Sequence, residues 1–192
     1  MPLLTDRNRP SSLCACGRCA RLGWPSVTAV DGDAGLDDLA SFRLDGSVYY
    51  VRWHSDGQAL DAVVPSESGD WAFPEMASCQ AAWPSWHPQW DAASAPTDFD
   101  SVSLWLRGLC LAMPNEAVLE AWNLAGDVAR GVGLAWHDRG PLRDRVYDKL
   151  LCASVPWFFG RDQYAPRWSP REHRAARQMA TQAVALVRTA LR

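Results

Sequence analysis

The sequence predicts an α+β fold, in which a small N-terminal antiparallel β-meander packs against a C-terminal bundle of about four helices. Three observations lead to this prediction. The β-branched and aromatic residues at 47–54 directly follow an Asp-Gly dipeptide at 45–46 that suits a two-residue hairpin turn. From residue 98 onward, apolar residues recur at the three- and four-residue spacing of helices. The residues Ser-Pro-Arg-Glu at 169–172 form a capping box with proline at the first helical position.

The meander is expected to contain three short strands. The stretch SFRL (41–44) leads into the Asp-Gly turn, SVYYVRWH (47–54) follows it, and ALDAVV (59–64) forms the third strand. Pro65 then ends the sheet, because proline cannot donate to a strand ladder. The acidic, glycine-rich stretch DGDAGLDD (31–38) is expected to be a loop before the first strand.

The middle strand is expected to have two different faces. Alternation places Tyr49, Val51 and Trp53 on one face, and Arg52 and His54 on the other. Because a sheet of two or three strands is marginal alone, other elements must cover at least one of these faces.

Four helices are expected in the second half of the chain. Asp98 or Asp100 is a suitable N-cap for the first, and Gly131 and Gly133 end the second. The predicted helices span 98–113, 114–133, 140–153 and 169–192.

Two proline-containing aromatic segments are expected to be irregular. The first, WPSWHPQWDAASAP (83–96), holds three prolines and three tryptophans. It follows a short helix predicted at 74–82, with Pro74 at the first position. The second, SVPWFFGRDQYAPRW (154–168), separates the last two helices. Ordered loops of this kind are uncommon unless they are functional or packed by their own side chains.

The chain of 192 residues is expected to form one compact unit. Residues 1–13 are polar and predict a disordered arm. Residues 14–97 hold a cysteine cluster, the meander and the first aromatic loop, and residues 98–192 hold the helices. The change in composition near residue 97 need not separate independent domains.

Composition and charge exclude several classes of function. The net charge is −3 and only one of the 19 basic residues, Lys149, is a lysine, so nucleic acid is an unfavourable partner. No apolar run approaches the about 18 residues of a membrane span, and the N-terminus lacks the apolar segment of a signal peptide. These features predict a cytoplasmic protein that does not act in a membrane, and the hypothesis favoured below takes it to be bacterial or from a phage.

A zinc site is the one cofactor that the sequence suggests. Three cysteines with C-x-C-x2-C spacing lie near the N-terminus: Cys14, Cys16 and Cys19. A tetrahedral site needs a fourth ligand, for which Cys79 is the first candidate and His87 the second. Four protein ligands would make the zinc structural. The alternatives are free thiols in a mobile arm, or redox-active thiols or another metal.

The sequence contains no recognised catalytic or phosphate-binding motif. The best alternative for an enzyme is a small hydrolase that uses His137 and Asp138 as an acid/base pair, together with Asp144 and Asp148 four residues apart on a helix. A solvated loop and a salt-bridged helix face explain the same residues, so catalysis is not the favoured interpretation.

The favoured hypothesis is a small protein-binding module. Aromatic side chains on irregular loops offer large rigid contact areas. Such a module would act as an inhibitor or an immunity-type neutraliser of a toxin or nuclease, with the acidic net charge masking a basic target. A zinc-stabilised nucleic-acid-associated adaptor is a further alternative. The expected contact residues are Trp83, Trp86, Trp90, Trp157, Phe158 and Phe159.

Overall fold

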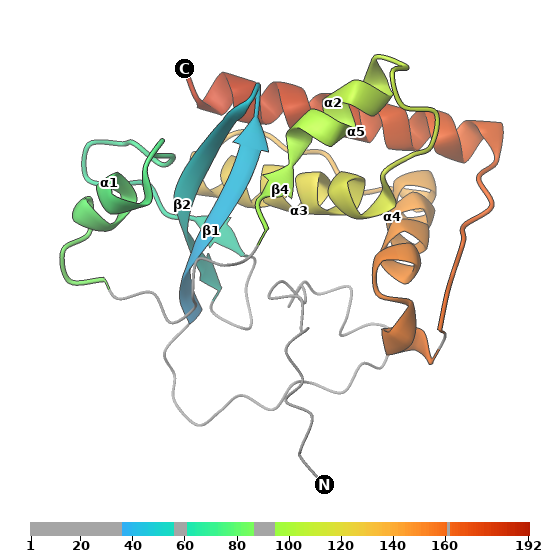
Figure 1. Cartoon of the computed structure of the whole chain (residues 1–192), viewed down its shortest axis with the longest axis horizontal. Coiled ribbons are helices and arrows are strands. Elements are labelled where there is room, and N and C mark those ends of the chain that lie inside the picture. The colour runs from blue at the N-terminus through green and yellow to red at the C-terminus, as the bar shows by residue number, and fades with distance from the viewer. Residues whose placement is uncertain (1–35, 56–60, 87–94, 161) are drawn as a thin grey trace, which may run out of the picture.

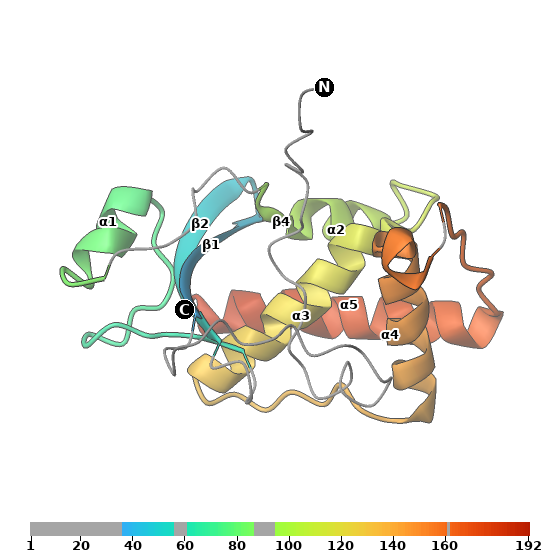
Figure 2. The same cartoon turned by 90° about the horizontal axis from the view of Figure 1, so that it is seen from below.

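The computed structural model describes residues 36–55, 61–86, 95–160 and 162–192. It confirms the α+β class, because a curled four-stranded sheet lies between one short helix and four longer ones (Figures 1 and 2). The predicted arm at 1–13 and the cysteines at 14–19 lie outside the described residues.

The sheet has the order β3-β2-β1-β4. The strands β1 (Leu36–Leu44), β2 (Ser47–Ser55) and β3 (Ala62–Val63) form the antiparallel meander that the sequence predicted. The hairpin turn is also confirmed, because Asp45 and Gly46 both have positive φ angles, 53° and 78°, as a type I′ turn requires.

Two details of the sheet differ from the prediction. Residues 36–38 of the predicted acidic loop belong to β1, where Asp37 lies opposite His54 and next to Arg52 across the strand pair. The opposite charges on β2 allow an acidic sequence to extend the strand. A fourth strand, β4 (Thr97–Asp98), pairs parallel with β1 and had not been expected.

The helices follow the predicted pattern with shifted ends. They are α1 (Met76–Ala81), α2 (Phe99–Leu106), α3 (Asn115–Gly131), α4 (Pro141–Ser154), the 3₁₀ helix η2 (Pro156–Phe159) and α5 (Pro170–Ala190). The N-cap of α2 is Asp98, whose Oδ1 accepts hydrogen bonds from the amides of Asp100 and Ser101. The predicted capping box of α5 is present, because Ser169 and Glu172 each accept from the other's backbone amide.

Helix α3 lies at the centre of the molecule and packs against α2, α4, α5 and the sheet. Helix α4 runs at a steep angle to α3 and α5 in both views, so the four longer helices are not aligned as in a regular bundle (Figures 1 and 2). The core combines both faces of α3 with the inner face of the sheet, and its largest buried side chains include Trp105, Phe42, Phe99, Leu150 and Met179.

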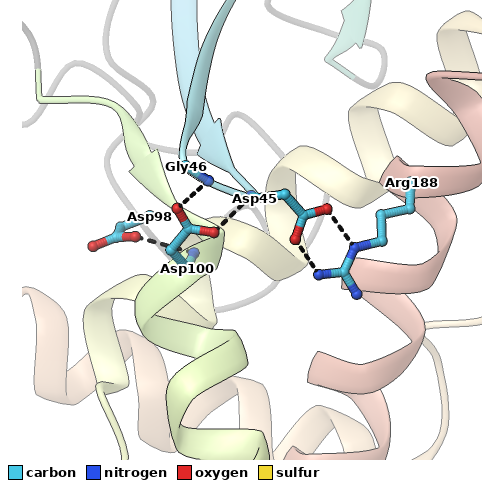
Figure 3. A network of polar contacts seen from close by, with 5 residues as sticks. All are labelled: Asp45, Gly46, Asp98, Asp100 and Arg188. Carbon is cyan, nitrogen blue, oxygen red and sulfur yellow. Dashed lines mark hydrogen bonds and ion pairs between the residues drawn. The ribbon is translucent and has the colours of Figure 1, made fainter.

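Two contacts fix the sheet on the helices. At one end, the C-terminal turn of α3 touches β3 so closely that a Cβ on Gly131 would lie 2.1 Å from the carbonyl oxygen of Val63. At the other end, Asp100 of α2 accepts hydrogen bonds from the amides of Asp45 and Gly46, and Asp45 pairs with Arg188 of α5 (Figure 3). The sheet is therefore held by helix residues at β3 and at the hairpin turn.

Candidate protein-binding surface

The first two predicted contact residues cover the outer face of the sheet. Trp83 is half-buried and Trp86 only 8% exposed, and both follow directly from α1. Their rings meet edge to face with centroids 6.0 Å apart. The guanidinium carbon of Arg52 lies 5.5 Å from the Trp83 ring and 5.6 Å from the Trp86 ring, within cation–π range. The expectation that these rings project outward therefore fails for Trp86, which is part of the interior.

Arg52 joins these aromatic rings to a small polar cluster. Its Nη2 donates to Oδ2 of Asp37 at 2.5 Å, and Nδ1 of His54 lies 3.1 Å from the other oxygen of the same carboxylate. Burial would raise the pKa of Asp37, but the hydrogen bond and charge of Arg52, aided by His54, hold it below its usual value. The alternation predicted for β2 is confirmed here, because Arg52 and His54 lie on the face opposite the core.

The remaining predicted contact residues lie elsewhere. Trp90 is outside the described residues. Trp157 on η2 is 52% exposed, whereas Phe158 and Phe159 are half-buried. Successive rings meet edge to face at 5.9 and 5.6 Å, and Gly160 ends the 3₁₀ turn with a φ of 64°. Trp157 is therefore the predicted contact residue that offers the most surface in a segment of defined conformation.

A second exposed apolar site follows α2, and sequence reasoning missed it. We call it the leucine turn: Leu104, Leu109 and Leu111, which are 41%, 71% and 97% exposed. Residues 98–113 had been predicted as one helix, but α2 ends at Leu106. The missed signal was Gly108, which adopts a φ of 75°.

Hydrogen bonds fix the backbone of the leucine turn from Leu104 to Leu109. The amide of Gly108 donates to the carbonyl of Trp105, and the amide of Leu109 donates to that of Leu104, each at 3.0 Å. These two bonds define a Schellman motif, which commonly brings the leucines at positions 104 and 109 into contact. Arg177 of α5 also donates to the carbonyls of Trp105 and Leu106, so the last carbonyls of α2 are satisfied.

The cysteine and catalytic candidates are not brought into a described site. Cys79 is fully buried, and in the metal-free chain burial raises the pKa of its thiol to about 11. His87 lies outside the described residues. Among the described side chains, no three or more His, Cys, Asp or Glu residues are grouped so as to hold a metal.

The alternative catalytic residues lie near the start of α4. His137 is exposed, and its carbonyl accepts a hydrogen bond from Arg143. Asp138 forms an ion pair with Arg139, whose Nε lies 3.7 Å from its carboxylate. Asp144 lies in the first turn of α4, and Asp148 is exposed one turn later.

One buried carboxyl group has an unusual environment. Asp127 on α3 accepts from Nε1 of Trp53 at 3.0 Å and from Arg130. Burial raises the pKa of Asp127 to about 7, although Arg130 and Trp53 both act to lower it. Because its oxygens are already bound by these two residues, Asp127 connects α3 to β2 and does not face an open site.

No protein-family model matches the chain, and neither the curated proteins nor the solved structures include one with significant similarity to it. Within the described ranges, no helix combines the length and apolar character that crossing a bilayer demands. Within the described residues, the leucine turn and Trp157 are therefore the features from which a function can be proposed.

Proposed function

We propose that this chain is a protein-binding module and that the leucine turn is its main contact site. The observation that carries the proposal is the exposure of Leu109 on a turn whose backbone is hydrogen-bonded in place, two residues before the almost fully exposed Leu111. Leaving a leucine in water forgoes about 1.5–3 kcal/mol of burial free energy. A partner that covers these side chains recovers part of it.

Trp157 is proposed as a second contact. A half-exposed tryptophan on a short 3₁₀ helix offers a rigid ring with few rotatable bonds, as binding hot spots do. An inhibitor or an immunity-type neutraliser of a toxin or nuclease would work through such contacts, and this remains our more specific proposal for the biological role.

The test is affinity capture from the source organism with three versions of the purified chain. The double variant Leu109→Ser/Leu111→Ser removes the proposed contact. Leu134→Ser is the matched control, because Leu134 is also an exposed leucine, 39% accessible, but follows α3. All three should have the same stability within about 0.5 kcal/mol, since surface substitutions of this kind have small effects.

We expect one stoichiometric protein that the wild-type chain and Leu134→Ser retain and the double variant loses. If the double variant retains the same protein at the same yield, the leucine turn is not the contact. If the wild-type chain retains no protein at all, the binding function is itself wrong.

We also retain a structural zinc ion as a proposal, with Cys14, Cys16 and Cys19 as ligands. Cys79 is proposed as the fourth ligand, because a bound zinc ion itself favours the thiolate form of a coordinating cysteine. Metal analysis of protein purified under reducing conditions without chelator should give about one zinc per chain. The ratio should fall to near zero in Cys16→Ser/Cys19→Ser, and an unchanged ratio in Cys79→Ser would exclude Cys79 as the fourth ligand.

A further inference from the structure

The leucine turn is flanked by positive charge. Arg107 is the C-cap of α2 and is exposed beside Leu104, three residues along the same helix face. On α5, His173 meets Trp105 edge to face with ring centroids 5.6 Å apart, and Arg177 donates to the last carbonyls of α2. Arg174 lies between them in sequence and is exposed, so it stands on the solvent side of this contact.

Two acidic residues beside the opposite, N-terminal end of α2 are bound within the chain. Asp45 binds two nitrogens of Arg188 at 2.9 and 2.5 Å, and this contact with Arg188 is the main cause of its lowered pKa. Both oxygens of Asp100 accept from backbone amides of the hairpin turn. Across the described part of the chain, neither Arg107 nor Arg174 takes part in an ion pair.

From this arrangement we infer the chemistry of the partner, an inference that rests on the proposed function above. The leucine turn binds a protein surface in which an apolar pocket is bordered by Asp or Glu carboxylates. The pocket takes Leu109 and Leu111, and the carboxylates pair with Arg107 and Arg174. The guanidinium group suits this role because it binds a carboxylate through two parallel hydrogen bonds.

Two other occupants fit the charges less well. A symmetric contact between two copies of this chain would place each arginine pair near its own equivalent, and like charges at an interface are unfavourable. An anionic bilayer would attract the arginines but repel a chain whose net charge is −3. A different protein with a local acidic patch avoids both the repulsion between like arginines in a dimer and the repulsion between the acidic chain and an anionic bilayer. The whole-chain charge had suggested a basic target, but the charge next to the contact residues is positive.

The experiment is a selection of displayed 12-residue random peptides on the immobilised full chain, with counter-selection on Leu109→Ser/Leu111→Ser. We expect the selected peptides to combine two or more Asp or Glu residues with large apolar residues. One such peptide, synthesised, should bind Arg107→Glu/Arg174→Glu at least about tenfold more weakly than the wild-type chain. Its affinity for the wild-type chain should also fall steeply between low and high salt.

The matched control is Arg145→Glu/Arg192→Glu, which reverses two exposed arginines on α4 and at the end of the chain. This variant has the same net charge as the test variant and should keep wild-type affinity. If both variants lose affinity equally, the effect is one of net charge and the inferred pairing is wrong.

The remaining outcomes separate the two proposals. If peptides that need the leucines are selected but carry no acidic residues, the binding site stands and the inferred partner chemistry fails. If no peptide depends on the leucines, the proposed function fails as well. The inference is also overturned if the chain is a dimer that the leucine variant makes monomeric, or if phosphatidylcholine/phosphatidylserine vesicles bind it through the same leucines.

Discussion

The carboxylate of Asp100 accepts a hydrogen bond from the backbone amide of Asp45 at 2.7 Å, although 55 residues separate the two in sequence. Its other oxygen accepts from the amide of Gly46 at 2.9 Å (Figure 3). One side chain in the first turn of α2 therefore satisfies both amides of the hairpin turn, and Asp45 carries the connection on to Arg188 of α5.

Removing this carboxylate should loosen the hairpin. We expect Asp100→Ala to lower the free energy of unfolding by about 1 kcal/mol, since hydrogen bonds to a charged group are lost but the exposed amides regain water. Asp100→Asn keeps one acceptor oxygen and should lie between the wild-type chain and the alanine variant. Urea denaturation measures both, and equal stability of all three proteins would contradict this role.

The tryptophans on the two aromatic segments should respond differently to truncation. Trp86→Ala removes a buried ring that packs on Trp83 and Arg52, and we expect it to cost about 3 kcal/mol or more. Trp157→Ala removes a ring that is half in water and should cost less than about 1 kcal/mol. Thermal and urea denaturation test the difference. A similar cost for both would mean that Trp157 is a packing residue and not a free contact site.

The sequence was informative wherever a local signal determines local structure. The Asp-Gly turn, the Asp98 N-cap and the capping box at Ser169 each depend on a few neighbouring residues, and the structure confirms all three. Strand β4 could not be predicted in this way, because a two-residue strand has no periodicity and exists through its pairing with Phe42 and Arg43.

The contact site was harder to predict because exposure depends on tertiary packing. An apolar run such as the one around Leu109 looks the same in sequence whether it ends a buried helix or forms an exposed turn. Trp86 shows the converse, since a tryptophan beside prolines can equally well cover a sheet face. Whether Trp86 is exposed or covers the sheet depends on its packing against Arg52, which lies on β2, far from Trp86 in sequence.

Lys149, the only lysine in the sequence, should affect how the stability of the fold changes at acidic pH, because it connects α4 to Glu172 of α5. Lys149 donates to Glu172 at 2.9 Å, and this bond, with those from Ser169, lowers the pKa of Glu172 to about 2 from an ordinary value of 4.5. A carboxyl group with a depressed pKa stabilises the fold above its ordinary value, and the stabilisation is lost as the pH falls from about 4.5 to about 2.

We therefore expect Lys149→Met to raise the pKa of Glu172 and to reduce the loss of stability over that pH range. Carboxyl carbon chemical shifts report the pKa, and urea denaturation at several acidic pH values reports the stability. Arg145→Met, on an exposed position of the same helix, is the control. An unchanged Glu172 titration in Lys149→Met would show that the serine cap alone lowers the pKa.

Asp127 should give the opposite pH dependence. Burial raises its pKa to about 7 from an ordinary value of 3.8, so the folded state holds a proton that the unfolded state releases. Its contribution to stability is therefore present at acidic pH and is lost as the pH rises from about 4 to about 7.

Asp127→Asn cannot ionise, and its stability should change less between pH 5 and pH 8 than that of the wild-type chain. Asp70→Asn, which changes an exposed residue, should keep the wild-type dependence. If Asp127→Asn instead shows the full wild-type loss of stability at pH 8, then another group is responsible for that loss.

The close approach of α3 to β3 requires glycine at position 131. A Cβ there would lie 2.1 Å from the carbonyl oxygen of Val63 and 2.6 Å from one of its methyl groups, so the strand or the helix end would have to move. We expect Gly131→Ala to lower the free energy of unfolding by about 3 kcal/mol, at the upper end of overpacking effects.

Gly126→Ala is the matched control on the same helix. The nearest neighbours of a Cβ at position 126 would be the end of the Arg130 side chain and the ring of Trp136, both at 3.3 Å. There the gain in helix propensity, about 1 kcal/mol, should offset most of the crowding. Urea denaturation measures the free energy of unfolding of the two variants. If Gly131→Ala is as stable as Gly126→Ala, the close approach of α3 to β3 does not require glycine at position 131.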